Sequence, residues 1–266
     1  MTSETCLVLS GKGGVGKTAV FSNVATSIAT MGKKTVVMDA DLAMANLGLV
    51  FGLQDIPITL HEVLAGKATI GEAIYAGPGG LKVIPCGDTI AGFQEADPAG
   101  LVEVIDYFKS RTEYLFIDAP VGVNEDIFLM LPHVDNVILI ATPDLASMAD
   151  ALKMKIIVES LGCRIKGIVL NRVDTMNLDE IETIVKNTME LEILSVIPND
   201  PNIQEAAMKM VPLVTYLPDS PASIALTRLA ANIAGVEYKP MIKKAGWFQR
   251  QIGKLRVKGT EKYGPN

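Results

Sequence analysis

Short runs of consecutive apolar residues recur along this chain and alternate with amphipathic stretches. The apolar runs lie at residues 5–9, 35–38, 81–84, 114–117, 137–141, 167–170 and 193–197. Apolar positions at helical spacing predict helices at residues 19–31, 101–109, 146–160, 179–188 and 223–234. Continuous apolar runs are typical of strands buried on both faces of a parallel sheet. The pattern predicts an α/β fold, a doubly wound and mostly parallel sheet with helices on both faces.

The segment after the first apolar run carries the clearest chemical signal. Residues 10–18 read SGKGGVGKT and fit the phosphate-binding pattern G-x-x-x-x-G-K-[ST]. Backbone N–H groups of such a loop, together with the following helix N-terminus, cradle phosphate oxygens. We expect the cradle at Gly11, Gly13, Gly14, Val15 and Gly16, with Lys17 at the β- and γ-phosphates and Thr18 as a Mg²⁺ ligand.

Polar residues stand directly after other predicted strands. Asp39 and Asp41 follow the second run, and Asp118 ends the fourth. In a doubly wound sheet such residues share the carboxyl edge, where a carboxylate can orient a metal-bound or an attacking water. Each of these aspartates is also compatible with a helix cap or a turn. Asn171 follows a later run, and its amide suits a purine edge, although a turn position is at least as compatible.

Length and composition narrow the possible classes of protein. The chain of 266 residues predicts one α/β domain, with room for a tail. Its three cysteines are far apart, and it has two histidines, which argues against a disulfide framework, a cluster scaffold or a histidine-rich metal site. No secretory signal and no apolar run near the ~20 residues that span a bilayer is visible. A cytoplasmic protein is therefore expected.

Charge is distributed unevenly. Residues 239–266 carry a net charge of +7 in a chain whose total is −6, which leaves −13 on the rest. At helical spacing, the tail forms an apolar stripe with basic side chains beside it, at Trp247, Phe248, Ile252 and Leu255 and at Arg250 and Lys254. This pattern predicts a helix lying on an anionic membrane surface. A helix docked on the body and a basic arm for DNA remain alternatives.

Several motifs together resemble those of the MinD/ParA family of ATPases. KGGVGKT (12–18) resembles the deviant Walker A signature, DADLAMANL (39–47) resembles switch I, and DAPVG (118–122) resembles switch II. Val121 stands where the family usually has alanine. The C-terminal stretch resembles the membrane-targeting tail of MinD-like members. The resemblance implies a P-loop NTPase of the SIMIBI type over residues 1–236, followed by a connector and tail at 237–266.

The resemblance also implies a set of residue roles. ATP and Mg²⁺ are the implied cofactors, with Asp39 and Asp118 near the metal. Lys12 would contact the phosphates of a partner subunit, and Asp41 would orient the hydrolytic water. Asn171 and Arg172 would bind the adenine, with Pro198 and Asp200 in the loop on its other side.

The function implied is a slow, partner-stimulated ATP hydrolase. It would dimerise with ATP, bind reversibly to the inner face of the cell membrane, and position or recruit a protein client, as in cell division site placement. Alternatives are a DNA-partitioning ATPase, a flagellum- or chemosensory-array-positioning ATPase, and a metallocentre carrier. The acidic body and aromatic tail favour membrane over DNA, so no specific nucleic acid is expected.

Overall fold

The computed structural model describes residues 3–174 and 178–238. Its described strands form one eight-stranded sheet in the order β3-β4-β2-β5-β1-β6-β7-β8. The strands are β1 (Glu4–Leu9), β2 (Thr35–Asp39), β3 (Tyr75–Ala76), β4 (Lys82–Ile84), β5 (Tyr114–Asp118), β6 (Asn136–Ala141), β7 (Ile165–Val173) and β8 (Ile193–Pro198). All neighbouring pairs are parallel except β3 with β4, which are antiparallel at one edge.

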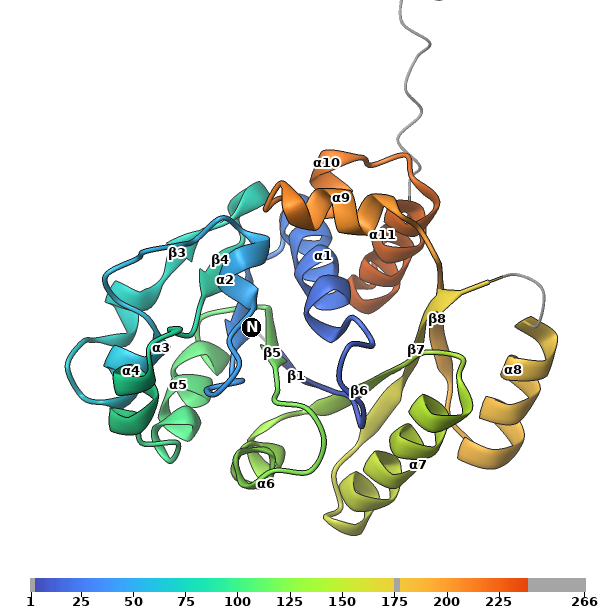
Figure 1. Cartoon of the computed structure of the whole chain (residues 1–266), viewed down its shortest axis with the longest axis horizontal. Coiled ribbons are helices and arrows are strands. Elements are labelled where there is room, and N and C mark those ends of the chain that lie inside the picture. Colours follow the sequence, from blue (N-terminus) through green and yellow to red (C-terminus); the bar gives the residue numbers. More distant parts are fainter. Residues whose placement is uncertain (1–2, 175–177, 239–266) are drawn as a thin grey trace, which may run out of the picture.

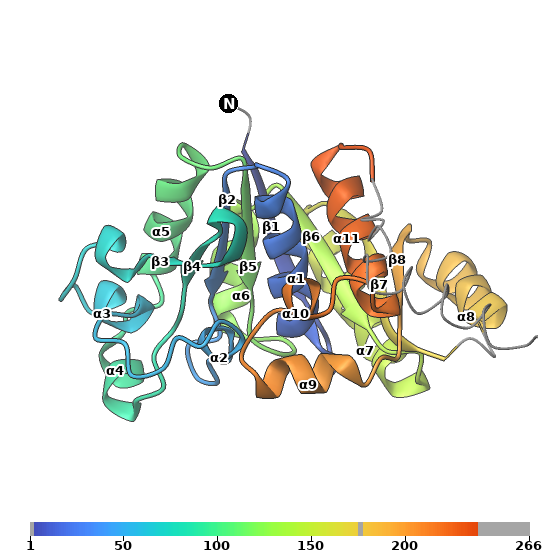
Figure 2. The same cartoon turned by 90° about the horizontal axis from the view of Figure 1, so that it is seen from above.

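Helices lie on both faces of this sheet, as Figures 1 and 2 show. The α-helices are α1 (Lys17–Thr30), α2 (Leu47–Val50), α3 (Leu60–Leu64), α4 (Ile90–Glu95), α5 (Gly100–Lys109), α6 (Glu125–Met130), α7 (Leu145–Ser160), α8 (Leu178–Ile184), α9 (Asn202–Met208), α10 (Leu213–Tyr216) and α11 (Pro221–Ala234). Short 3₁₀ turns occupy Ile70–Ala73, Pro78–Gly80 and Leu131–His133, and a π-helical turn occupies Val185–Met189. The predicted α/β architecture is confirmed.

The two faces of the sheet bury separate hydrophobic cores. On one face, Leu7 of β1 and Ile117 of β5 pack in a cluster with residues of α5, α6 and α7. On the other, Val8 and Phe116 pack with residues of α1 and α11, and the rings of Phe21 and Phe116 are 5.4 Å apart. Because alternate residues of one strand face opposite cores, both sides of the pleat are apolar. This explains the continuous apolar runs in the sequence.

Strand order places the polar residues of the site together. β1 lies between β5 and β6, and β5 pairs with β2 so that Asp39 is directly opposite Asp118. The segment after β1 therefore emerges beside the carboxyl ends of β5 and β2, where ligands bind in open α/β sheets. Of residues 3–174 and 178–238, no helix combines the length and the apolar character that crossing a bilayer requires.

Candidate nucleotide site

Residues 10–16, the phosphate loop, join β1 to the N-terminus of α1. Gly14 and Gly16 have φ values of 77° and 90°, which a residue with a β-carbon adopts only with strain. A β-carbon at Gly16 would also lie 2.5 Å from the amide nitrogen of Asn171. No side chain caps α1, and no acidic residue lies in its first turn. The N–H groups at this helix end are thus available to an anion such as a phosphate.

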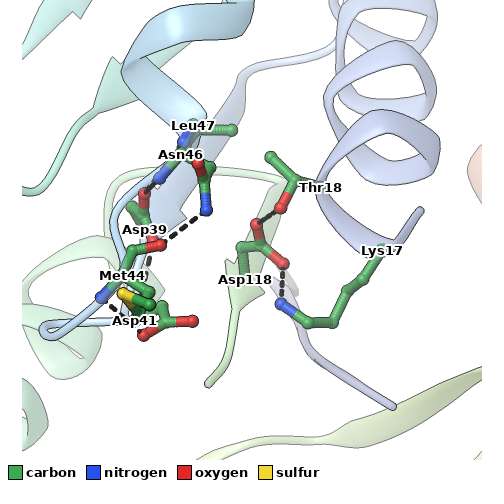
Figure 3. Close-up of polar contacts among 8 residues, drawn as sticks. All are labelled: Lys17, Thr18, Asp39, Asp41, Met44, Asn46, Leu47 and Asp118. Atoms are coloured by element: carbon green, nitrogen blue, oxygen red, sulfur yellow. Dashed lines mark hydrogen bonds and ion pairs between the residues drawn. The ribbon is translucent and has the colours of Figure 1, made fainter. Parts of the chain in front are cut away.

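Lys17 and Thr18, the first residues of α1, both point at the carboxylate of Asp118 (Figure 3). The Lys17 ammonium forms an ion pair with one carboxylate oxygen, and the Thr18 hydroxyl donates to the other. Lys17 and Asp118 are buried, with 7% and 3% of their surfaces exposed. The Thr18 hydroxyl and the Asp118 carboxylate offer the hard oxygen ligands that Mg²⁺ prefers. The Lys17 ammonium next to them is suited to a phosphate. These residues fit both a nucleotide phosphate and its metal.

Asp39 shapes the segment that follows β2. Its carboxylate accepts hydrogen bonds from the backbone N–H groups of Asp41 at 3.1 Å, Asn46 at 3.0 Å and Leu47 at 2.9 Å (Figure 3). Burial, and then repulsion from Asp118, raise the pKa of Asp39 to about 7. Asp39 therefore holds both ends of residues 40–46, which we call the switch loop. Its expected place near the metal remains a prediction.

A hollow of about 430 Å³ lies over the phosphate loop. Its lining combines the loop with the switch loop, α2 and residues of two more distant segments: Ser10, Gly14, Val15, Gly16, Lys17, Thr18, Ala19, Asp41, Asn46, Leu49, Val50, Val121 and Ala207. We call it the phosphate pocket. Asp41 is half-buried there, and one of its carboxylate oxygens accepts the N–H of Met44 at 3.0 Å. The structure thus brings Asp41 to the same pocket as Lys17 and Thr18, while its role toward a water remains a prediction.

A second hollow, of about 280 Å³, adjoins the first at Gly16 and Ala19, which line both. Its other lining residues are Asn171, Arg172, Asn199, Asp200, Pro201, Ile203 and Gln204. The Asn171 amide is 2% exposed and donates to the carbonyl of Val15 at 2.7 Å, while its Oδ1 has no hydrogen-bond partner among the described residues. That buried acceptor suits a ligand donor such as an exocyclic amine of a base.

Asp200 and Pro198, which were also expected near the base, have different positions in the structure. Asp200 accepts the N–H groups of Asn202 at 2.9 Å and Ala222 at 3.2 Å, so it ties the start of α9 to α11. Pro198 ends β8 and is not among the residues that line the hollow. Asn199, from the same expected loop, lines it, as does Gln204, which the sequence did not single out. Their roles toward a base remain predictions.

Lys12 lies outside both hollows of its own subunit. Its ammonium is 3.2 Å from the carboxylate of Asp144, and the two side chains are 45% and 48% exposed. Asp144 caps α7 by accepting the N–H of Ser147 at 3.0 Å, and the Thr142 hydroxyl donates to it at 2.6 Å. The Thr142 hydroxyl, then Ser147 and Lys12, lower the pKa of Asp144 to about 2. The second lysine therefore pairs with Asp144 and does not line its own phosphate pocket.

Fold and site together define a P-loop nucleotide-binding protein. The family described as the CobQ/CobB/MinD/ParA nucleotide binding domain matches residues 6–213, which is most of the chain. The chain belongs to this MinD/ParA family, whose members bind ATP with Mg²⁺.

Relatives and solved structures agree with this assignment. An uncharacterised ATP-binding protein of Methanocaldococcus jannaschii is 40% identical over 237 residues, covering 89% of this chain and 90% of its own. The septum site-determining protein MinD of Pyrococcus horikoshii, solved with Mg-ADP, is 33% identical with a TM-score of 0.80, over 87% of this chain and 96% of its own. The Aquifex aeolicus MinD solved in a MinC:MinD complex is 25% identical, with a TM-score of 0.78. The match covers 89% of this chain and 98% of the Aquifex chain.

Proposed function

We propose that this protein is an ATP hydrolase that dimerises when it binds ATP and, as a dimer, binds an anionic membrane surface. The observation that carries the proposal is the placement of Lys12, a phosphate-loop lysine outside the phosphate pocket of its own subunit. A partner subunit's γ-phosphate would replace Asp144 as the partner of that ammonium. The experiment is sedimentation with anionic liposomes in ATP and in ADP, where we expect sedimentation with ATP only.

The residues around the phosphate pocket suit hydrolysis of the γ-phosphate. Lys17 offsets the negative charge that the transferring phosphoryl group carries, and the N–H groups of the phosphate loop hold its oxygens. Thr18 and Asp118 would hold a Mg²⁺ ion, which would supply neutralisation of the phosphate charge. Asp41 lines the pocket, and its carboxylate can orient a water toward phosphorus.

Replacing Asp41 by alanine tests the water-orienting role. We expect Asp41→Ala to lower kcat by about 10²-fold, within the range for loss of a positioned acid or base group. ATP binding should change less than about threefold, because the side-chain hydrogen bond found for Asp41 is to the Met44 N–H of its own loop and Asp41 does not line the second hollow, at Asn171. Single-turnover hydrolysis and a fluorescent-nucleotide titration measure the two quantities. Asp88→Ala, an exposed aspartate outside the phosphate pocket, is the matched control, and equal rates in both variants would remove Asp41 from the mechanism.

Exposed apolar side chains beside the phosphate loop support a self-association face. Leu145 follows Asp144 at the start of α7 and is 87% exposed. Val121 lines the phosphate pocket and is 44% exposed, and Val123 is 56% exposed. Apolar groups of this kind are buried favourably in a dimer that also closes over the nucleotide. ATP would then join two subunits through both phosphate contacts and apolar contacts.

The membrane contact is assigned to the tail at residues 237–266, which follows an ATPase domain proposed at residues 1–236. The residues expected at the membrane, Trp247, Phe248, Arg250, Ile252, Lys254 and Leu255, lie outside the described residues. Burying one such apolar side chain gives about 1.5–3 kcal/mol, and each basic residue near an anionic surface adds about 1. Ordering the tail offsets much of this. Two tails on one dimer would gain about 10²–10⁴ in avidity, which links membrane binding to ATP.

Replacing Trp247 by glutamate tests this link. We expect Trp247→Glu to reduce ATP-dependent sedimentation with anionic liposomes by at least about tenfold, since it removes the largest apolar contact and adds a negative charge. Basal hydrolysis should be unchanged. Thr260→Glu makes the same change of charge outside the apolar stripe and is the control. Undiminished sedimentation of Trp247→Glu would show that the tail is not the anchor.

The proposed biological role is to recruit or position a protein client at the membrane. MinD of Aquifex aeolicus forms a complex with MinC, and the resemblance of this chain to MinD favours a client of that kind. Co-precipitation with the slowly hydrolysing Asp41→Ala variant in ATP would capture the client, since the dimer should persist. We expect capture in ATP but not in ADP, and equal capture in both would separate client binding from the nucleotide.

A further inference from the structure

The switch loop is fixed at its ends by Asp39, and Leu42 is the buried residue in its middle. Ala40, next to Asp39, is also buried, whereas residues 41 and 43–46 are exposed or half-buried, and Leu42 is 3% exposed. The Leu42 side chain belongs to the core cluster that also contains Leu60 and Leu64 of α3. Its carbonyl oxygen is 3.0 Å from Nε2 of His61, also on α3. The middle of the loop therefore depends on α3.

His61 is buried, with 1% of its surface exposed, in a closely fitted site. A β-carbon at Gly87 or at Gly92 would lie 2.8 Å or 2.9 Å from its Nδ1, so glycine at both positions leaves room for the ring. α3 itself is held by a capping box at Thr59 and by the Leu60 N–H, which donates to the carbonyl of Pro85 at 2.9 Å. These contacts leave the imidazole little freedom to turn.

The hydrogen bond to Leu42 indicates which ring nitrogen of His61 is the donor. A carbonyl oxygen only accepts, so Nε2 must carry the proton, and Nδ1 is then an acceptor. Nδ1 has no partner among the described residues. Burying an unpaired nitrogen costs free energy that an apolar side chain of similar size would avoid. A purely space-filling role thus explains His61 less well than a donor role toward the switch loop.

We propose that His61 is a positioning residue for the switch loop, and that its Nε2–H fixes the Leu42 carbonyl so that Asp41 stays at the phosphate pocket. Asp41 is the residue before Leu42, and Asn46, at the other end of the loop, lines the same pocket. The proposal rests on the proposed function, in which Asp41 orients the attacking water. Near-attack geometry is sensitive to displacements of about 1 Å, so a freed loop would slow hydrolysis.

Hydrogen exchange of the nucleotide-free full chain tests the tether without any reaction. His61→Leu keeps a buried apolar volume but has no donor, whereas His61→Gln places an amide N–H at a similar reach. In His61→Leu we expect the amides of Met44 and Asn46 to exchange about fivefold faster, as losing one hydrogen bond implies. His61→Gln should stay near the native rate. Leu64→Val, a packing change on the same helix, is the control. If His61→Leu does not fold, His61→Met, which also lacks a donor, takes its place in the experiment.

ATP hydrolysis supplies the second readout. We expect His61→Leu to lower single-turnover hydrolysis by about tenfold with KM for ATP changed less than threefold, and His61→Gln to restore most of the rate. Unchanged exchange at residues 40–46 in His61→Leu, or equal defects in the leucine and glutamine variants, would overturn the proposal. Asp41→Ala separates this from a failure of the proposed function. If Asp41→Ala hydrolyses ATP normally, the proposed water-orienting role of Asp41 is wrong, whereas a slow Asp41→Ala beside a normal His61→Leu overturns only the tether.

Discussion

Replacing Lys17 by alanine is expected to weaken ATP binding by at least about 100-fold. Lys17 is the cation that the structure places in the phosphate pocket, 7% exposed and facing Asp118. A hydrogen bond to a charged group is worth about 1.5–3 kcal/mol, and the upper end of this range corresponds to roughly 100-fold in affinity. Removing Lys17 also leaves the buried Asp118 carboxylate beside the phosphates without its counter-charge, which increases the loss.

A fluorescent-nucleotide titration measures the Lys17 effect, with a thermal melt of the apoprotein beside it. The melt is needed because removing one partner of a buried ion pair destabilises the fold as well. We expect Lys17→Ala to fold and to fail in binding. Native affinity in a folded Lys17→Ala protein would contradict the placement of the phosphates against residues 11–18.

Replacing Lys12 by alanine is expected to leave ATP binding intact and to abolish ATP-dependent dimerisation. The Lys12 ammonium lies at Asp144, outside the phosphate pocket, so ATP binding by the single subunit should stay within about threefold of native. ATP-dependent dimerisation should be lost, because the partner's phosphates would lack their trans cation. The exposed pair with Asp144 is no obstacle to such a contact, since surface ion pairs contribute only about 0–1 kcal/mol.

Analytical ultracentrifugation in ATP and in ADP measures this second effect. Lys82→Ala removes another exposed lysine, at the start of β4, and should dimerise normally. A normal ATP dimer of Lys12→Ala would remove the lysine from the interface. Loss of monomeric binding in the same variant would instead place Lys12 in its own pocket.

The sequence predicted those parts of the site that depend on local pattern. The phosphate loop is recognisable because its glycines, Lys17 and Thr18 all lie within residues 11–18, and because an apolar strand precedes them. Asp118 could be placed beside them because strands buried on both faces are continuous apolar runs that end abruptly. Because the strands are parallel, the residues that follow each apolar run lie together at the carboxyl edge of the sheet. Fold class and the main polar residues of the site follow from these two regularities.

Contacts between distant residues could not be predicted in this way. The pair of Lys12 with Asp144 joins residues 132 positions apart, and nothing in either segment indicates the other. The three backbone N–H groups at Asp39 depend on the path of the switch loop, which no periodicity specifies. The sequence did not single out His61, and only the fold brings it to Leu42.

Short or irregular helices and strands also could not be predicted, because they are too short to show a periodic pattern. Helices of four to six residues, such as α2 (Leu47–Val50) and α4 (Ile90–Glu95), are too short to display a 3.6-residue period. β3 has two residues, and its antiparallel pairing covers one edge of the sheet. The predicted helix at residues 179–188 begins at Leu178, is α-helical to Ile184, and continues as a π-helical turn to Met189. Tertiary packing sets these boundaries.

The claim that Lys12 serves the partner subunit is tested most directly by mixing two inactive variants. One subunit carries Lys12→Ala and keeps Asp41, and the other carries Asp41→Ala and keeps Lys12. If Lys12 acts across the interface, one of the two sites in the mixed dimer contains a native Asp41 and a native Lys12. We predict that mixing restores ATP hydrolysis well above the sum of the separate variants. Hydrolysis no faster than that sum would contradict the account, because it would mean that Lys12 and Asp41 must lie in the same chain.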